Sequence, residues 1–81
     1  MDKLQQDIHL FPNPARDIIT ITNIKAGDHL SIFNTQGNLI HRKVASSGQE
    51  SIAVGKLASG VYILQVTDNE KKKRIIRFTK F

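Results

Sequence analysis

The sequence predicts an all-β fold, a seven-strand antiparallel sandwich of immunoglobulin-like shape. About seven short segments rich in β-branched and aromatic residues alternate with turn residues at close, fairly regular spacing. No segment shows the helical period of apolar residues. The chain has only 81 residues, which is room for one domain with a thin core, and two packed layers of strands bury apolar stripes economically at that size.

The strongest strand candidate is the stretch from Leu57 to Thr67, in which the turn residues Ala58-Ser59-Gly60 precede a long β-forming run. Alternate residues of this run divide between two faces, with Tyr62, Leu64 and Val66 on one and Val61, Ile63, Gln65 and Thr67 on the other. Because both faces begin apolar, we expect a central strand with a neighbour on each edge and some cover over each face.

The remaining strands follow from the same pattern, and we expect them at residues 7–11, 18–22, 30–34, 39–44, 51–54 and 72–79. The first should be an edge strand that ends at Pro12-Asn13-Pro14, because proline lacks a backbone donor. Ile19 and Ile21 should point inward from the second. The third and fourth form the clearest hairpin, in which Gly37 supplies a positive φ. In the last, Ile76 and Phe78 share one face and Ile75 takes the other.

The ends of the chain and its composition limit the classes of protein. We interpret the polar residues 1–6 as a linker remnant or an expression start, and residues 7–81 as the domain. The first ten residues lack the apolar core of a secretory signal. If the protein is exported by the general route, we therefore expect its signal to lie upstream of this segment. No apolar run approaches the ~20 residues of a membrane helix. With no cysteine, the chain has no disulfide, no thiolate nucleophile and no cysteine-based zinc site.

Positive charge is concentrated near the end of the chain. The net charge is +5, and six of the twelve Lys and Arg residues lie within the last eleven positions: Lys71, Lys72, Lys73, Arg74, Arg77 and Lys80. An anionic partner would therefore act at this end. A solvated basic edge strand that discourages edge-to-edge pairing is the structural alternative.

Catalytic and metal-binding patterns are missing, so we predict no enzyme, no cofactor and no metal. His9, His29 and His41 are far apart in the sequence and fall on three different predicted elements, and no serine lies in a Gly-x-Ser-x-Gly motif. The acidic residues lie mostly at turns, where carboxylates cap backbone amides: Asp17, Asp28, Glu50, Asp68 and Glu70. Calcium binding by a cluster of turn carboxylates stays open, although the spacing of an EF-hand is not present.

Two kinds of ligand-binding domain fit the aromatic residues poorly. Phe33, Tyr62 and Phe78 are not interleaved with Lys and Arg as a nucleic-acid stacking platform requires. A sugar-binding sandwich normally offers a stacking surface, and this chain has no Trp and a single Tyr.

Four features occur in an order that closely resembles the type A C-terminal sorting domain of the type IX (Por) secretion system. They are Phe11-Pro12-Asn13-Pro14 with Asp17, the hairpin from Ile32 to Ile40, Leu57-Ala58-Ser59-Gly60-Val61-Tyr62, and a basic-hydrophobic strand at the end of the chain. Each motif alone is common. Their order and spacing make the combination specific, and the resemblance extends over residues 8–81.

The resemblance implies that this domain is an address label on a larger exported protein of a Gram-negative bacterium. In that family, the folded sandwich is recognised by the outer-membrane translocon and its shuttle components, and it crosses with its N-terminally fused cargo. A sortase-like surface peptidase then removes it and commonly joins the cargo to anionic lipopolysaccharide. Cleavage is expected near or upstream of residues 1–6, and the cargo would be secreted or attached to the cell surface.

The same resemblance implies candidate recognition residues, which fall into three groups. The proline motif is Pro12, Asn13 and Pro14, the glycine-strand motif is Gly60, Val61 and Tyr62, and the terminal motif is Lys73, Arg74, Ile75 and Ile76. Purely structural roles would also account for each group, as a strand end, a turn and part of the core.

Two further questions stay open at the level of the sequence. The alternative function is an accessory module that binds polysaccharide or another surface ligand. Weak self-association through the basic edge is also open.

Overall fold

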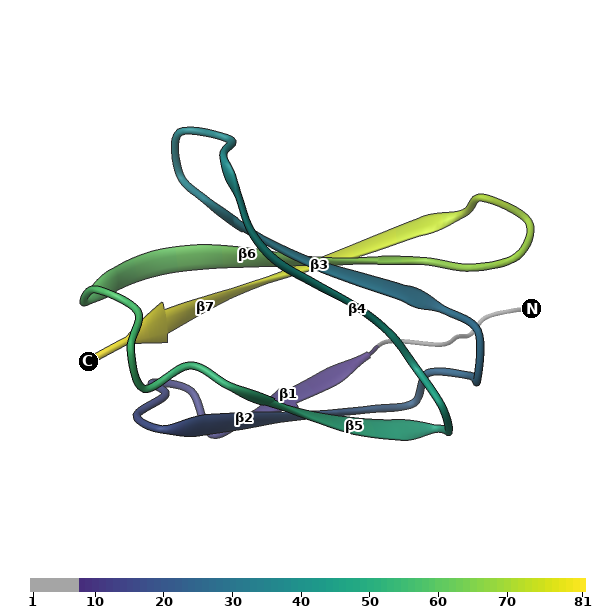
Figure 1. Cartoon of the computed structure of the whole chain (residues 1–81), viewed down its shortest axis with the longest axis horizontal. Coiled ribbons are helices and arrows are strands. Elements are labelled where there is room, and N and C mark those ends of the chain that lie inside the picture. The colour runs from purple at the N-terminus through teal and green to yellow at the C-terminus, as the bar shows by residue number, and fades with distance from the viewer. Residues whose placement is uncertain (1–7) are drawn as a thin grey trace.

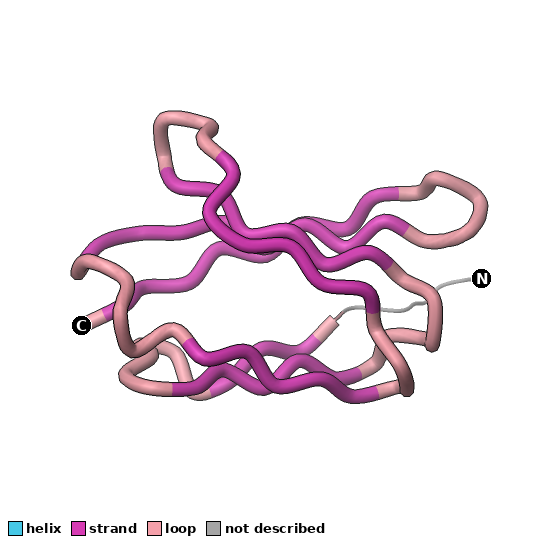
Figure 2. Tube along the Cα trace, in the orientation of Figure 1, coloured by secondary structure: helices cyan, strands magenta, loops and turns pink. Residues whose placement is uncertain are grey.

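Seven strands form two antiparallel sheets that face each other across one core (Figure 1). The computed structural model describes residues 8–81, so the predicted linker at residues 1–6 lies outside the described part of the chain. The three-stranded sheet has the order β1 (His9–Phe11), β2 (Ile18–Thr22), β5 (Gln49–Ala53). The four-stranded sheet has the order β4 (Leu39–Val44), β3 (His29–Asn34), β6 (Gly60–Thr67), β7 (Lys73–Lys80). Figure 2 shows only strands and loops over the described residues, which confirms the predicted all-β sandwich.

Strand β6 occupies the centre of the four-stranded sheet, as predicted. It pairs with β3 from Tyr62 to Thr67 on one side and with β7 along its whole length on the other. Tyr62, Leu64 and Val66 point into the core and are buried, whereas the alternate residues on the outer face are partly exposed. The expected cover over that second face is therefore only partial, because the sandwich has two layers and the outer face of β6 is shielded only by neighbours in its own sheet.

The core consists of branched aliphatic side chains contributed by both sheets. Its fully buried members include Ile19 and Ile21 of β2, which confirms the predicted inward pair. From the four-stranded sheet come Leu30, Ile32, Leu64, Val66 and Phe78. The ring of Phe78 stacks on Tyr62 with 5.7 Å between ring centroids, which joins β6 and β7 at one end of the core.

The β3–β4 hairpin has the predicted turn and projects away from the sandwich (Figure 1). Gly37 has a φ of +86°, and the Oδ1 atom of Asn34 accepts hydrogen bonds from the backbone N–H groups of Gln36 and Asn38 at 2.9 and 3.0 Å. A register shift lies beside this turn, between Ile32 and Phe33 of β3. Strand β4 is an edge strand, and most of its side chains are exposed.

Strand β5 begins two residues earlier than predicted, at Gln49 instead of Ser51. The backbone of Gln49 and Glu50 pairs with Thr22 and Ile21 of β2, and the side chain of Glu50 is buried. Polar residues gave no local indication of this extension, which depends on pairing with a distant strand.

Replacing Leu64 by alanine should lower the free energy of unfolding by about 2–5 kcal/mol, since the side chain is fully buried at the centre of β6 and its removal leaves a cavity. Urea unfolding followed by circular dichroism measures this change. Ile75→Ala on the exposed face of β7 is the matched control and should change stability by at most about 0.5 kcal/mol. Equal losses in the two variants would contradict the assigned core.

Candidate functional site

The structure brings two of the three predicted recognition motifs together and separates the third. The connection after β1 carries Pro12-Asn13-Pro14, and Gly60–Tyr62 opens β6; both lie at the end of β7 that contains Phe78 to Phe81. Lys73–Ile76 begins β7 at its other end. Six residues of extended chain between Lys73 and Thr79 correspond to about 20 Å. The motifs therefore form two separate areas joined by one strand.

The proline motif is attached to β7 by hydrogen bonds across 66 residues of sequence. The backbone N–H of Thr79 donates to Oδ1 of Asn13 at 3.0 Å. The N–H of Ala15 donates to the carbonyl of Thr79 at 2.7 Å, and the N–H of Phe81 donates to the carbonyl of Ala15 at 2.9 Å. This short segment adds a parallel bridge to the end of β7, so the side chain of Asn13 serves the fold directly.

The two prolines flank this attachment and remain exposed to solvent. Both Phe11-Pro12 and Asn13-Pro14 are cis peptide bonds. Next to them, the guanidinium of Arg16 lies 4.8 Å from the ring centroid of Phe81, a cation–π contact that the sequence did not indicate.

In the glycine-strand motif, two residues have structural roles and one side chain is exposed. Gly60 has a φ of +152°, which side chains disfavour, and pairs with Lys80. Tyr62 is only 7% exposed, and its hydroxyl donates to the carbonyl of Ala58 at 2.6 Å, so it holds the preceding turn. Val61, which pairs with Thr79, is the residue of this motif whose side chain reaches the outer face.

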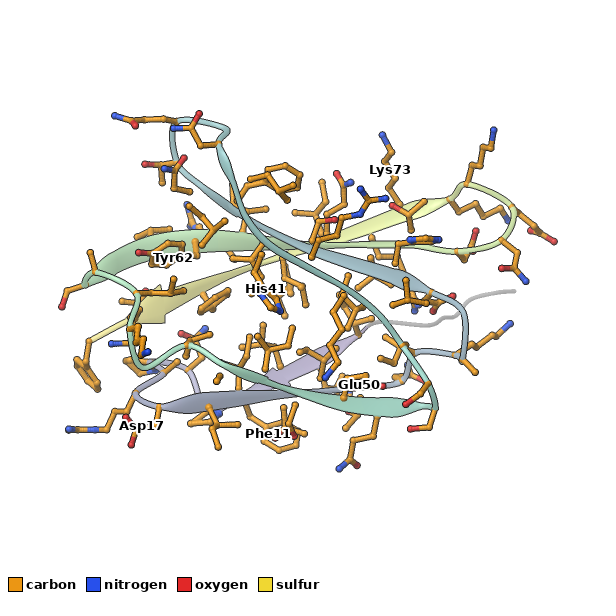
Figure 3. All side chains as sticks on the ribbon, in the orientation of Figure 1. Phe11, Asp17, His41, Glu50, Tyr62 and Lys73 are labelled. Carbon is orange, nitrogen blue, oxygen red and sulfur yellow. The ribbon has the colours of Figure 1, made fainter. Side chains whose placement is uncertain are left out.

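The residues of the terminal motif lie alternately on the outer and inner faces of β7. Lys73 and Ile75 lie on the outer face, and Ile75 is 64% exposed. Figure 3 shows Lys73 pointing away from the three-stranded sheet. Arg74 lies on the inner side, with its guanidinium 3.7 Å from the Asp28 carboxylate and 3.3 Å from the Asn23 carbonyl, and Ile76 packs against the core. Lys73 and Ile75 can therefore contact a partner without disturbing these inner contacts.

A shallow groove crosses the outer face of the four-stranded sheet beside Lys73. Three cations, Arg42, Lys71 and Lys73, and one carboxylate, Asp68, line it, and Phe33 and Leu39 form its apolar part. Such a lining suits an anionic ligand that also has an apolar or stacking surface.

Two of the acidic residues, Asp28 and Asp68, cap backbone amides at turns, as predicted. Asp68 accepts from the N–H groups of Glu70 and Lys72, each at 2.9 Å, and Asp28 accepts from the N–H of Lys25 at 2.9 Å. The pKa of Asp68 is lowered, chiefly by its bond to Lys72. Among residues 8–81, no three His, Asp or Glu side chains are grouped to hold a metal ion. His9, His29 and His41 are exposed on separate strands.

Glu50 is a buried carboxylate that links the two sheets. It lies on β5, accepts from the backbone N–H of Ser46 at 2.6 Å and from its hydroxyl at 2.8 Å, and forms an ion pair with Lys43 of β4 at 2.9 Å. These interactions, led by the backbone bond from Ser46, lower the pKa of Glu50 to about 2.

Comparison with known proteins identifies relatives over most of the chain. Residues 9–77 match the family model for the secretion system C-terminal sorting domain. The chain is 34% identical over 73 residues to an endo-acting ulvan lyase of Formosa agariphila, covering 86% of this chain and 14% of the lyase. It is 26% identical over 73 residues to beta-agarase A of Zobellia galactanivorans, covering 88% of this chain and 14% of the agarase.

Among solved structures, the chain resembles PorZ of Porphyromonas gingivalis, an essential bacterial surface component of the type-IX secretion system. The TM-score is 0.83 at 30% identity, covering 91% of this chain and 11% of PorZ. The chain thus spans a small part of each of these proteins. No helix in residues 8–81 is long and apolar enough to cross a membrane.

Asn13→Ala should lower the free energy of unfolding by about 1 kcal/mol, because it leaves the Thr79 N–H without its acceptor. Amide exchange at Thr79, measured by nuclear magnetic resonance, should become faster. Asn13→Asp retains an acceptor oxygen and is the control that should keep the amide protected. Unchanged exchange in Asn13→Ala would show that this attachment does not hold the end of β7.

The hydrogen bonds from Ser46 and the ion pair with Lys43, which lower the pKa of Glu50, should make stability depend on acid pH. Because the folded pKa is about 2 and the ordinary value is 4.5, the stabilisation is complete above pH 4.5 and is lost as the pH falls toward 2. The midpoint temperature of Glu50→Gln should therefore lie below that of the parent at pH 7, and the difference should shrink across this range.

Glu70→Gln makes the same change of charge at an exposed pair, whose atoms are 3.8 Å apart, and it should have little effect throughout. A constant difference between the parent and Glu50→Gln from pH 7 to pH 2 would contradict the role assigned to the Glu50 carboxylate.

Proposed function

Because the chain belongs to the family of secretion system C-terminal sorting domains, we propose that it directs an upstream cargo protein through the type IX outer-membrane translocon and is then removed by a sortase-like surface peptidase. The main support for this proposal is the family match over residues 9–77, which is nearly the whole described sandwich. The expected resemblance to this family is confirmed. Export is the role that the family assigns to such a domain.

The proposed unit is residues 7–81, with the cargo fused on its N-terminal side. In support, the chain corresponds to 14% of each of two much longer enzymes, the lyase and the agarase. On this proposal, the cargo passes through the periplasm and the outer membrane and is secreted or held on the cell surface. The domain itself is a substrate of the machinery and carries no catalytic activity.

We propose that recognition uses the exposed members of the three motifs. On this proposal, the exposed Pro12 and Pro14 form one contact area with Val61, because Asn13 between the prolines and Val61 both contact Thr79, and the exposed Lys73 and Ile75 form the other. Asn13, Gly60, Tyr62, Arg74 and Ile76 would act by holding these areas in place, since each of them has a structural contact or a backbone requirement. Recognition of this kind depends on a folded sandwich, because no single segment contains both areas.

A second candidate function is attachment of the parent protein to an anionic surface ligand such as a charged polysaccharide. The groove lined by Arg42, Lys71, Lys73 and Phe33 supports it. The two functions differ in the fate of the domain: a sorting signal is missing from the mature protein, whereas a binding module remains and retains its ligand.

An export assay tests the proposed function. Residues 7–81 are fused behind a periplasmically exported fluorescent protein in hosts with and without the type IX translocon, and the location and mass of the reporter are measured. We expect the reporter outside the cell, without the mass of the domain, only where the translocon is present. A reporter that stays in the periplasm with a folded domain would contradict the sorting role and favour the binding module.

Substitution of Lys73→Glu together with Ile75→Glu should reduce export of this fusion at least about tenfold, because the charge and apolar contact of one proposed area are lost, a penalty on the order of 1.4 kcal/mol or more in binding. Lys56→Glu, an exposed loop position outside the motifs, is the control and should export normally. Thermal unfolding of the purified variants must show intact folding in both. Normal export of the double variant would exclude this area from recognition.

A further inference from the structure

Strand β7 leaves part of one edge of the four-stranded sheet open. It pairs with β6 on one side over its whole length. On its other side, the segment containing Asn13 and Ala15 covers only the end from Thr79 to Phe81. Within the described residues, no strand pairs with this side of Lys73–Arg77. An extended partner can therefore add to the sheet along this stretch.

Hydrogen bonds at the two ends of β7 establish which of its backbone groups face away from β6. The N–H and C=O groups of Thr79 point away from β6, because they bond to Asn13 and Ala15. The carbonyl of Lys72 points toward β6, since it accepts from the N–H of Asp68 across the hairpin. Along a regular antiparallel strand, the N–H and C=O groups of successive residues point alternately toward and away from the neighbouring strand. The register between β6 and β7 shows no shift, so this alternation is unbroken along β7. The outward groups are therefore those of Lys73, Ile75 and Arg77.

The side chains of the same three residues lie in a row on the outer face, with the apolar Ile75 between the cations Lys73 and Arg77. All three are exposed. In the described chain, no carboxylate forms an ion pair with Lys73 or Arg77: Asp28 pairs with Arg74, Glu70 with Lys72, and Glu50 with Lys43. An added strand would place its own side chains opposite these positions, about 4.5–5.5 Å away between Cβ atoms.

We propose that the Lys73–Arg77 edge binds an extended acidic segment of a partner protein by β-strand addition. The facing side chains of that segment read acidic, apolar, acidic at alternate positions, opposite Arg77, Ile75 and Lys73. Backbone hydrogen bonds to three outward residues provide the docking, and the two charge pairs select the partner and its register. This proposal deepens the recognition of β7 proposed above by naming the mode and chemistry of binding.

Charge argues against a second copy of this chain as the occupant. An antiparallel pair of β7 strands centred on Ile75 would place Lys73 of one copy opposite Arg77 of the other. Like charges at directly opposite positions destabilise a sheet, so the edge opposes self-pairing while it favours an acidic strand.

Binding of a synthetic peptide to the 81-residue chain tests the proposal without a secretion system, so its outcome is separate from that of the export assay. The probe contains the alternating core Glu-Thr-Val-Thr-Glu and a fluorescent label, and its affinity is measured by fluorescence anisotropy. A peptide of the same composition with its glutamates adjacent is the control for charge alone. Hydrogen exchange of the parent chain should show new protection at the amides of Lys73, Ile75 and Arg77, and none at those of Arg74 and Ile76.

Ile75→Pro removes an outward N–H and leaves the bonds between β6 and β7 in place, a position that proline tolerates at a sheet edge. Compared with Ile75→Thr, which keeps the N–H, it should bind the alternating peptide about tenfold more weakly. Equal affinity of these two variants, equal affinity for the two peptides, or no protection at the three alternate amides in the parent would each overturn β-strand addition. The exchange result needs no variant, so it decides the matter even if Ile75→Pro fails to fold.

Discussion

The attachment of residues 13–15 to the end of β7 is the contact on which the closure of this sandwich depends. It connects the first strands of the chain with the last one, and it combines a side-chain acceptor, Asn13, with two backbone bonds through Ala15. Without it, the backbone at the end of β7 would pair with β6 alone, although Phe78 would still pack in the core. Because the segment is short, it closes the edge at Thr79–Phe81 and leaves Lys73–Arg77 open, so one feature determines both the stability of the last strand and its available surface.

Because strand side chains alternate between two faces, each strand motif contains residues that hold the fold and residues that a partner can contact. Along the start of β7, Arg74 and Ile76 face inward to Asp28 and the core, while Lys73 and Ile75 face outward. Motif residues are adjacent in sequence because inner and outer residues of a strand must alternate. A pattern shared by related domains therefore mixes residues that maintain the shape with residues that a partner can contact. Substitutions have to be interpreted face by face.

Local patterns were sufficient for most of the fold. The inward pair Ile19 and Ile21, the turn at Gly37 and the central position of β6 each have a signal within a few residues. The attachment of Asn13 to Thr79 has none, since it joins an asparagine side chain to a backbone amide 66 residues away. Glu50 was expected at a turn as a polar residue, and only the approach of Lys43 and Ser46 explains its burial. Contacts that depend on sheet order were the ones that the sequence alone left undetermined.

Positive charge on an edge strand has opposite consequences for different partners. For a second copy, Lys73 and Arg77 add repulsion to the entropy lost on pairing. For an acidic strand, the same charges add attraction. The backbone hydrogen bonds are the same whether the added strand is acidic or a second copy of β7. Selectivity then comes from the charges and affinity from the backbone, so added salt should reduce the difference between partners more than it reduces pairing itself. An edge of this kind can remain unpaired among many copies of its own domain and still be available to one class of partner.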